Sequence, residues 1–155
     1  MKFKGDIIIT DPCYIIRAKH HGTVPLTEND WQTCEYGENM EALGINNYLS
    51  SDTLYGDWSC TTINSDNGES IGGFCADAGM VAVFLLDEVL KYNPDFDYHI
   101  NKPWTTTLIK DFDGEIEIKI VNVEYRNEDG EVEYEDEVRV IGTGNVNFFT
   151  TQSGF

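Results

Sequence analysis

Apolar residues along the chain fall into short runs bounded by turn-forming residues, a pattern that predicts β-strands. The apolar run at residues 5–16 is interrupted by Pro12, which favours a strand that ends or bulges there. Residues 71–86 form a nearly continuous run of Val, Phe and Leu, which predicts a second buried strand. The segment "WTTTLIKDF", residues 104–112, predicts a further strand.

The clearest pattern is the alternation in "EIEIKIVNVEYRNEDGEVEYEDEVRVI", residues 115–141. Polar and apolar residues alternate on both sides of Asp129-Gly130, which predicts a β-hairpin with a tight turn at that pair. The adjacent apolar residues Ile120 and Val121 break the alternation and predict a β-bulge.

The register of this hairpin depends on the length of its loop. A two-residue loop places Tyr125 opposite Tyr134, which is a favourable cross-strand pair. The same register sets Glu124 opposite Glu135, and two like charges in that position are destabilising. A longer loop is therefore the alternative.

Two segments have the features of short helices. In "VPLTENDWQTCEYG", residues 24–37, Thr27 is a candidate cap, and Asp87 is a candidate cap for "DEVLKY". Strands otherwise dominate, so we expect a mainly β (α+β) fold with an antiparallel sheet or sandwich and two short accessory helices. The length of 155 residues predicts one domain, residues 1–155.

The composition is strongly acidic. Hydrophobic residues make up 41% of the chain, enough for a folded core, while 28 acidic residues against 10 basic ones give a net charge of −18. Such a charge repels nucleic acid and anionic membranes and attracts cations or basic protein surfaces. The same acidity also serves solubility alone, and that interpretation stays open.

Acidic residues concentrate in the predicted hairpin, with twelve acids and two bases in residues 111–137. Four of the acids recur at every second position and share one strand face: Glu131, Glu133, Glu135 and Glu137. Their side chains are about 6.6 Å apart, close to the spacing of phosphates along a DNA strand. Either this face is solvated and protects a sheet edge, or it binds a basic groove of a partner.

Cysteine and aspartate recur together in two places, as Asp11-Pro12-Cys13 and as Cys75-Ala76-Asp77. If the two strands are neighbours, two thiols and two carboxylates converge, which is a sufficient ligand set for zinc. Asp57, in "LYGDWSC", is a candidate fifth member. The alternative is two buried thiols beside aspartates that form turns.

The chain has none of the motifs that mark common catalytic sites, such as a nucleophile elbow, a phosphate-binding glycine loop or a dinucleotide fingerprint. We therefore expect no enzymatic activity. The three histidines (His20, His21 and His99) are expected to be solvated or structural. Neither a secretory signal nor a membrane-spanning apolar stretch is apparent, so we expect a cytoplasmic protein with reduced thiols.

Three segments resemble a known family. "DPCY", "YGDW" and "CADAGMVAVFLLDEVL" are similar to the D-P-C-Y, Y-G-D-G and V-D-A-G blocks of a family of small proteins from phages and prophages. The chain departs from these blocks at Trp58, where the family has Gly, and at Ala76, where it has Val. The resemblance implies that Asp11, Asp57 and Asp77 meet in one site, and it does not extend through the acidic hairpin.

A phage origin implies a class of function. Small acidic phage proteins without an enzyme motif resemble, as a class, inhibitors of host defence such as anti-CRISPR proteins. We therefore expect a phage-encoded inhibitor of a type II, Cas9-type effector in the host cytoplasm. Its acidic surface would bind the basic nucleic-acid channel of that protein partner, without touching nucleic acid or membrane and with a structural zinc ion. The alternative is a protein that sequesters a small signalling nucleotide.

Overall fold

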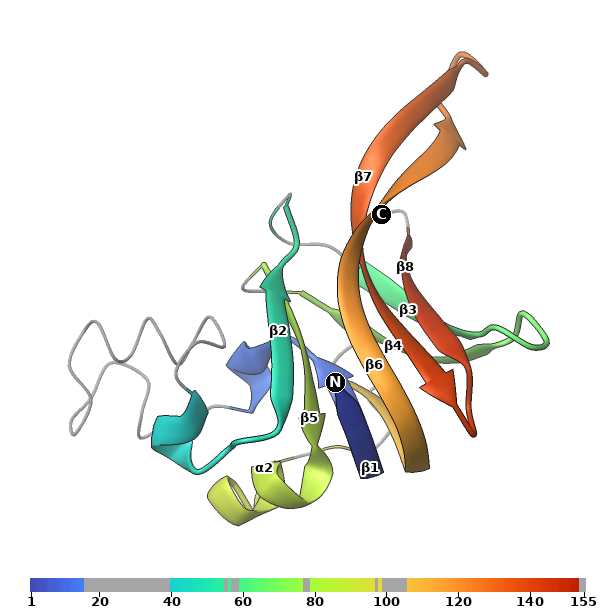
Figure 1. Cartoon of the computed structure of the whole chain (residues 1–155). Helices are drawn as coiled ribbons and strands as arrows, with labels where there is room; N and C mark the ends of the chain where they lie inside the picture. Colours follow the sequence, from blue (N-terminus) through green and yellow to red (C-terminus); the bar gives the residue numbers. More distant parts are fainter. Residues whose placement is uncertain are drawn as a thin grey trace.

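The computed structural model describes residues 1–15, 40–54, 56, 59–76, 79–96, 98 and 106–153. Within these residues all eight strands form one antiparallel sheet in the order β2-β5-β1-β6-β7-β8-β3-β4 (Figure 1). The mainly β fold with an antiparallel sheet is confirmed. The elements are β1 Lys2–Thr10, η1 Pro12–Tyr14, η3 Met40–Leu43, β2 Tyr48–Asp52, β3 Ser59–Asn64, β4 Ser70–Cys75, β5 Met80–Leu85, α2 Leu86–Tyr92, β6 Thr106–Arg126, β7 Val132–Gly144 and β8 Phe148–Ser153.

A β-bulge lies in the centre of the sheet, where β1 pairs with β6. The register shifts between Gly5 and Ile7, so that two residues of β6, 110–111, lie opposite Asp6 alone. Asp111 has a φ of 52°, and its backbone N–H donates to the Asp6 carboxylate at 2.9 Å. Bulges of this kind increase the local twist and bend of a sheet.

The bulge predicted at Ile120-Val121 is wrong. The pairing of β6 with β7 runs without a register shift from Gly114 to Arg126. Ile120 and Val121 lie on opposite faces of β6, so two apolar residues in succession do not require a bulge. Val121 is half-buried on one face, whereas Ile120 is exposed on the other.

The bent sheet encloses a hydrophobic core between its two halves. Phe112 of β6 and Phe148 of β8 meet edge to face, with ring centroids 5.7 Å apart. The hydroxyl groups of Thr62 on β3 and Thr107 on β6 are 2.9 Å apart and link strands that are not neighbours in the sheet. The larger side chains of this core are Phe3, Ile7, Ile9, Phe74, Val83, Ile109, Phe112, Ile116, Val138, Val140 and Phe148.

A second core covers the opposite face of β1 and β5. Ile8 and Phe84 of these strands pack with Val89 of α2 and with Ile15 and Met40 from the 3₁₀ segments. Ile8 therefore points to this core while Ile7 and Ile9 point to the first. Because both faces of β1 are buried from Ile7 to Ile9, this part of the strand is continuously apolar instead of alternating.

The single strand predicted at residues 71–86 is wrong. The chain forms two strands here, β4 and β5, which lie far apart in the sheet order. Gly79 has a φ of 73°, a conformation that glycine adopts without strain, and its N–H donates to the carbonyl of Ala76 at 3.1 Å. Gly79 thus lies between the partly buried β4 and the buried β5, whose apolar residues run together in the sequence.

The predicted short helix after β5 is confirmed as α2, but its predicted cap is wrong. The helix begins at Leu86, its N-cap residue is Leu85 without a side-chain hydrogen bond, and Asp87 lies in the first turn. A carboxylate in that position still interacts favourably with the helix dipole. The other predicted helix, residues 24–37 with Thr27, lies outside the described residues.

Candidate partner-binding arm

Strands β6 and β7 extend well past their neighbours in the sheet. The ladder between β1 and β6 reaches only Lys2↔Glu115, and that between β7 and β8 stops at Ile141↔Phe149. Beyond these points β6 and β7 pair with each other and project from the body as a two-stranded ribbon (Figure 1). We call residues 120–136 the arm.

The register of the arm matches the longer loop. Glu124 lies opposite Tyr134, not opposite Glu135, and Tyr125 lies opposite Glu133. The two-residue-loop register is therefore wrong. The observed pairing separates the two like charges that made the shorter loop unfavourable.

The predicted hairpin turn at Asp129-Gly130 is confirmed, within a loop of residues 127–131. Asn127 organises this loop, because its side-chain oxygen accepts hydrogen bonds from the N–H groups of Asp129 and Glu131, both at 3.0 Å. Gly130 has a φ of 78°, which a glycine supplies at no steric cost.

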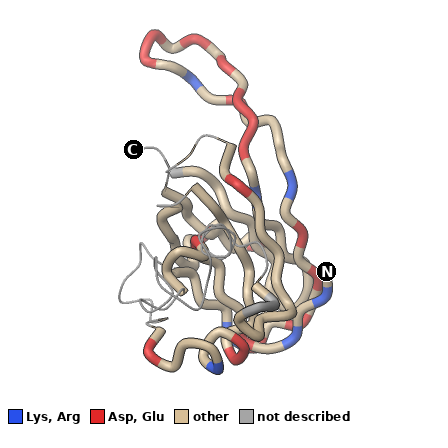
Figure 2. The backbone as a smooth tube through the Cα atoms, turned by 90° about the vertical axis from the view of Figure 1, so that its left-hand side faces the viewer, with Lys and Arg blue, Asp and Glu red and all other residues tan. Residues whose placement is uncertain are grey.

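The arm is strongly acidic. Figure 2 shows acidic residues following the arm outward from the body. These 17 residues hold a net charge of −6 out of −18 for the chain, with Arg126 as the one base. The seven acids are Glu124, Glu128, Asp129, Glu131, Glu133, Glu135 and Asp136.

Little of this charge is neutralised within the described residues. Arg126 donates to the carbonyl of Gly130 at 2.8 Å and is thereby held at the turn. The described ion pairs, Lys119–Glu117 at 3.6 Å and Arg139–Glu137 at 2.9 Å, lie outside the arm. The arm therefore presents negative potential to any approaching molecule.

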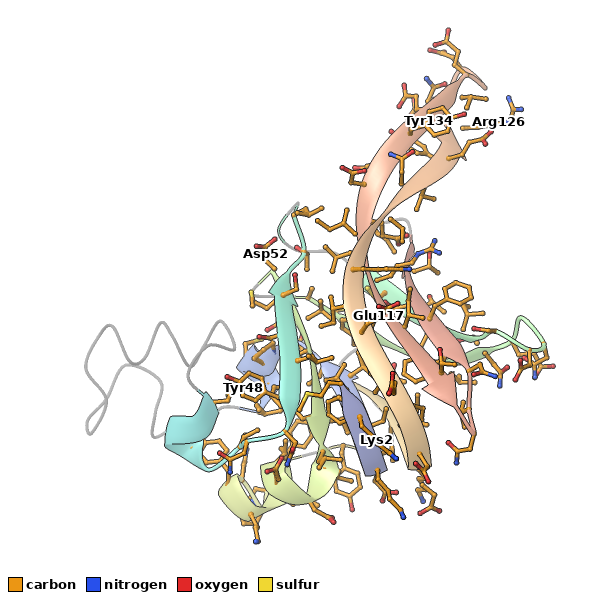
Figure 3. The ribbon with its side chains drawn as sticks, viewed as in Figure 1. Lys2, Tyr48, Asp52, Glu117, Arg126 and Tyr134 are labelled. Atoms are coloured by element: carbon orange, nitrogen blue, oxygen red, sulfur yellow. The ribbon has the colours of Figure 1, made fainter. Side chains whose placement is uncertain are left out.

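The arm also carries much of the exposed apolar surface. Of the six large hydrophobic side chains that are exposed among the described residues, four lie on the arm: Ile120, Tyr125, Val132 and Tyr134. Tyr134 and Arg126 are labelled near the tip in Figure 3. Aromatic and aliphatic side chains beside charges are typical of surfaces that bind proteins.

The four predicted partner-binding glutamates do not form one exposed face. Glu131 and Glu133 are exposed, with Glu131 in the loop, and Glu135 is half-buried. Glu137 is only 5% exposed, so its prediction as an exposed partner-binding residue is wrong. The alternation assigned all four to one strand face, but Glu131 precedes the strand and β8 covers that face at Glu137.

Glu137 fixes the base of the arm. Its carboxylate accepts hydrogen bonds from the backbone N–H of Gln152, from the Thr151 hydroxyl at 3.2 Å and from Arg139 Nε at 2.9 Å. Nearby, the N–H of Val140 donates to the Thr150 hydroxyl at 2.9 Å. Side chains thus satisfy backbone groups at the point where β7 and β8 separate.

Glu133 lies in a cluster of polar groups on the arm. It accepts hydrogen bonds from the Tyr125 hydroxyl at 2.6 Å and from the Asn127 side-chain amide at 2.8 Å. These two donors lower the pKa of the Glu133 carboxyl below its ordinary value. The carboxylate stays charged and helps to fix the turn to the strands.

A groove of about 270 Å³ lies between the arm and β8. Thr151 and Gln152 line it on the β8 side. The arm contributes Val123, Tyr125, Glu135 and Asp136, and Glu137 lines the groove at the base of the arm. A groove lined by the acidic residues Glu135 and Glu137 and by Val123 and Tyr125 suits a cationic side chain with an aliphatic stem.

Asp11, the first of the predicted metal ligands, is fully buried and has a structural role. Its Oδ1 accepts a hydrogen bond from the N–H of Cys13 at 2.9 Å, and its Oδ2 accepts one from the N–H of Met80 at 3.2 Å. The carboxylate therefore caps η1 and connects the end of β1 to the start of β5. This explains the interruption of the apolar run by Asp-Pro.

The other predicted ligands are not brought together within the described residues. Cys75 is half-buried, with its Sγ 3.7 Å from the Ser59 hydroxyl. Asp57 and Asp77 lie outside the described part of the chain. No three His, Cys, Asp or Glu side chains in that part are placed to hold a metal ion. A zinc site stays a prediction.

Cys60 follows the candidate ligand Asp57 by three residues, and the sequence left open that it enters the same site. Burial raises the pKa of the Cys60 thiol far above its ordinary value, and the nearby Glu137 carboxylate and Cys75 raise it further. Cys60 is therefore a core thiol. His20, His21, His99 and Cys34 lie outside the described residues.

Comparison with known proteins adds no family. No protein-family model, no curated protein and no solved structure matches the chain. The resemblance to the phage blocks therefore stays a prediction. None of the described helices has the length and apolar character needed to cross a bilayer.

Apart from Glu135 and Glu137, the groove residues were missed by sequence reasoning. Val123 and Tyr125 read as ordinary members of an alternating strand, and Thr151 and Gln152 lie in a strand that the alternation did not predict. The signal that was available is the length of the hairpin. A hairpin longer than its neighbours must project beyond them, and its edge must then face an open space.

Proposed function

We propose that this protein acts by binding, and that the arm inserts into a basic groove of a partner protein that handles nucleic acid. The observation that carries the proposal is the extension of the arm beyond the strands that pair with β6 and β7 at its base. The arm holds seven acids and one base, and no other strand among the described residues pairs with it. A projecting ribbon reaches into a channel that the body of the protein cannot enter.

Charge gives the proposal its physical basis. Opposite potentials on two proteins steer their encounter and raise the association rate, an effect that salt screens. Residues of one strand are about 3.3 Å apart, so the seven residues at 120–126 extend about 20 Å into a partner. The carboxylates of the arm are thus spread over a length similar to that of several successive phosphates of a nucleic acid bound in a basic channel.

The finer proposal is a phage-encoded inhibitor of a host defence nuclease, of the type II Cas9 kind. Such effectors hold the guide–target duplex in a strongly positive channel, which is the kind of surface that the arm complements. The resemblance of three sequence blocks to phage proteins supports the phage origin. Inhibition would follow from occupancy of the channel, without catalysis.

Sequestration of a small signalling nucleotide has less support. Nucleotide phosphates need cationic or amide donors. The groove beside the arm is lined by Glu135, Asp136 and Glu137, which repel an anion. No described feature favours this function over partner binding.

A structural zinc ion is a separate proposal, carried by Cys13, Asp57, Cys75 and Asp77. Asp11 is the weakest of the five candidate ligands, because both of its oxygens already accept backbone hydrogen bonds. Elemental analysis of protein purified without a histidine tag tests it. One zinc per chain, lost in the Cys13→Ser/Cys75→Ser variant, supports the site, and absence of bound metal ends it.

The partner is identified by capture from host lysate on the immobilised protein, followed by a DNA-cleavage assay with the captured protein. We expect a nucleic-acid-binding protein that is released by DNA and by salt, and whose nuclease activity falls when this protein is added. Capture of proteins that DNA does not displace would contradict the proposal.

A further inference from the structure

We propose that the free edge of β7 accepts an extended segment of the partner as an added β-strand, in the groove between the arm and β8. The segment would carry Lys or Arg at alternate positions. This inference rests on the proposed function, since it specifies how the arm holds its partner. Strand addition to an exposed edge is a general mode of peptide recognition.

The backbone of β7 supports an added strand. In an antiparallel strand every second residue directs its N–H and C=O to the same side. The N–H of Val140 points toward β8, where it donates to Thr150. Counting in steps of two, Val132, Tyr134 and Asp136 direct their backbone groups to that side as well, beyond the end of the β7–β8 ladder.

The edge of β7 is unpaired along the arm because the ladder between β7 and β8 ends before the arm begins. The Glu137 carboxylate accepts a hydrogen bond from the N–H of Gln152. The Thr150 hydroxyl accepts one from the N–H of Val140. Within the described residues no strand pairs with β7 on this side beyond Ile141↔Phe149. An unpaired row of this kind is a template for another strand.

The side chains beside the edge indicate a basic occupant. Glu133 and Glu135 lie two residues apart on one face of β7, and residues opposite them on an added strand would have the same period of two. Val123 and Tyr125 of β6 line the same groove and offer apolar contact to an aliphatic stem. A lysine or arginine side chain can contact the apolar residues with its aliphatic stem and the carboxylates with its charged end.

Charge argues against a second copy of this chain as the occupant. Each arm holds a net charge of −6, and its one base, Arg126, donates to Gly130. Two arms placed edge to edge would repel each other. A basic segment of another protein avoids this cost.

The first test uses synthetic peptides as probes and fluorescence anisotropy as the readout. The probe is a labelled peptide of alternating Lys and Thr, and its control is the same peptide with N-methyl groups on every second backbone amide. N-methylation removes the hydrogen-bond donors needed for strand addition and leaves the charge unchanged. We expect the control to bind at least about tenfold more weakly, because several hydrogen bonds are lost.

The second test changes the edge itself. Tyr134→Pro removes one outward N–H, which a proline at an edge position does without breaking the β6–β7 ladder. Tyr134→Thr is the matched control, since it also removes the ring but keeps the N–H. We expect the Tyr134→Pro variant to bind the alternating peptide about tenfold more weakly than the Tyr134→Thr variant does. The circular dichroism spectra of the two variants should match that of the parent.

The outcomes separate this inference from the proposed function. Equal binding of the two peptides, or equal binding by the two Tyr134 variants, overturns strand addition and leaves a purely electrostatic arm. No binding of either peptide also overturns strand addition. Binding that depends on the free amides, together with a failure to capture a nucleic-acid-handling partner, supports the strand site and removes the proposed partner. Self-association of the protein at physiological salt, where repulsion between the arms is screened, would indicate a second copy as the occupant.

Discussion

The carboxylate of Glu137 on β7 accepts a hydrogen bond from the backbone N–H of Gln152 on β8. A side chain thus takes the place of a backbone acceptor at the point where the two strands part. The same carboxylate binds Thr151 and Arg139, so one residue joins the arm to the sheet. Its role is structural, although it belongs to an acidic run that otherwise faces outward.

Replacing Glu137 should destabilise the protein. Glu137→Ala leaves the N–H of Gln152 without its acceptor in a partly buried position, and we expect a loss of about 2–3 kcal/mol in the free energy of unfolding. Glu137→Gln keeps one acceptor oxygen and should cost about half as much. Urea denaturation measures both. Glu135→Ala is the control, expected within about 0.5 kcal/mol of the parent, and an equal loss there would contradict this role of Glu137.

Asp11 should prove equally important for stability. Asp11→Ala removes the acceptor of two backbone N–H groups, those of Cys13 and Met80, and we expect a loss of about 2–3 kcal/mol. Asp11→Asn retains one good acceptor oxygen, so its loss in the free energy of unfolding should be smaller. Thermal or urea unfolding checks this order, with the exposed Glu115→Ala as a control. If Asp11→Ala unfolds like the parent, the carboxylate does not join β1 to β5.

The cysteines should differ in their reactivity. Cys60 is buried and its pKa is raised by that burial, so its thiolate is scarce at neutral pH. We expect a maleimide to modify Cys13 and Cys75, which are half-buried, before Cys60. Peptide mapping by mass spectrometry after timed labelling locates each adduct. Labelling of Cys60 in the folded protein at the rate of Cys75 would show that the core opens there.

The arm should loosen in acid through Glu133. Hydrogen bonds from Tyr125 and Asn127 lower the pKa of its carboxyl. The stabilisation is therefore fully present above the ordinary glutamate pKa, and it is lost as the pH falls through the lowered value. Side-chain carbon shifts in an NMR titration report this pKa. We expect Tyr125→Phe to raise it toward the ordinary value, and an unchanged pKa would show that the Tyr125 hydrogen bond is absent in solution.

The hairpin was predictable because its signal is local. Alternation on both sides of Asp129-Gly130 and the cost of placing Glu124 opposite Glu135 are both contained in one stretch of sequence. The alternation also assigned Glu131, Glu133, Glu135 and Glu137 to one strand face. The burial of Glu137 depends on the position of β8, whose residues Thr151 and Gln152 contact it. That position is not contained in the hairpin sequence, so the burial could not be predicted from it.

The beginning of the chain illustrates the same limit. The carboxylate in Asp11-Pro12-Cys13 raised a metal hypothesis because thiols and carboxylates are metal ligands. Its observed partners include the backbone N–H of Met80, which the fold brings beside it from a distant part of the sequence. Backbone groups carry no residue-specific signal, so a carboxylate that binds them looks the same in the sequence as one that binds an ion.

The central claim is that the arm, and not the overall acidity, binds the partner. Two variants with equal net charge separate these explanations. The arm variant combines Glu124→Gln, Glu128→Gln, Glu131→Gln and Glu135→Gln. The body variant neutralises four exposed acids elsewhere, with Glu69→Gln, Asp87→Asn, Asp95→Asn and Glu115→Gln.

The most direct measurement is the association rate of each variant with the captured partner, by surface plasmon resonance at low and at physiological salt. We expect the arm variant to associate at least about tenfold more slowly than the parent at low salt, and the body variant to stay within about twofold of it. The difference should shrink at physiological salt, where screening acts beyond about 8 Å. Equal rates for the two variants would contradict the account, because binding would then follow net charge and the arm would be only a solvated sheet edge.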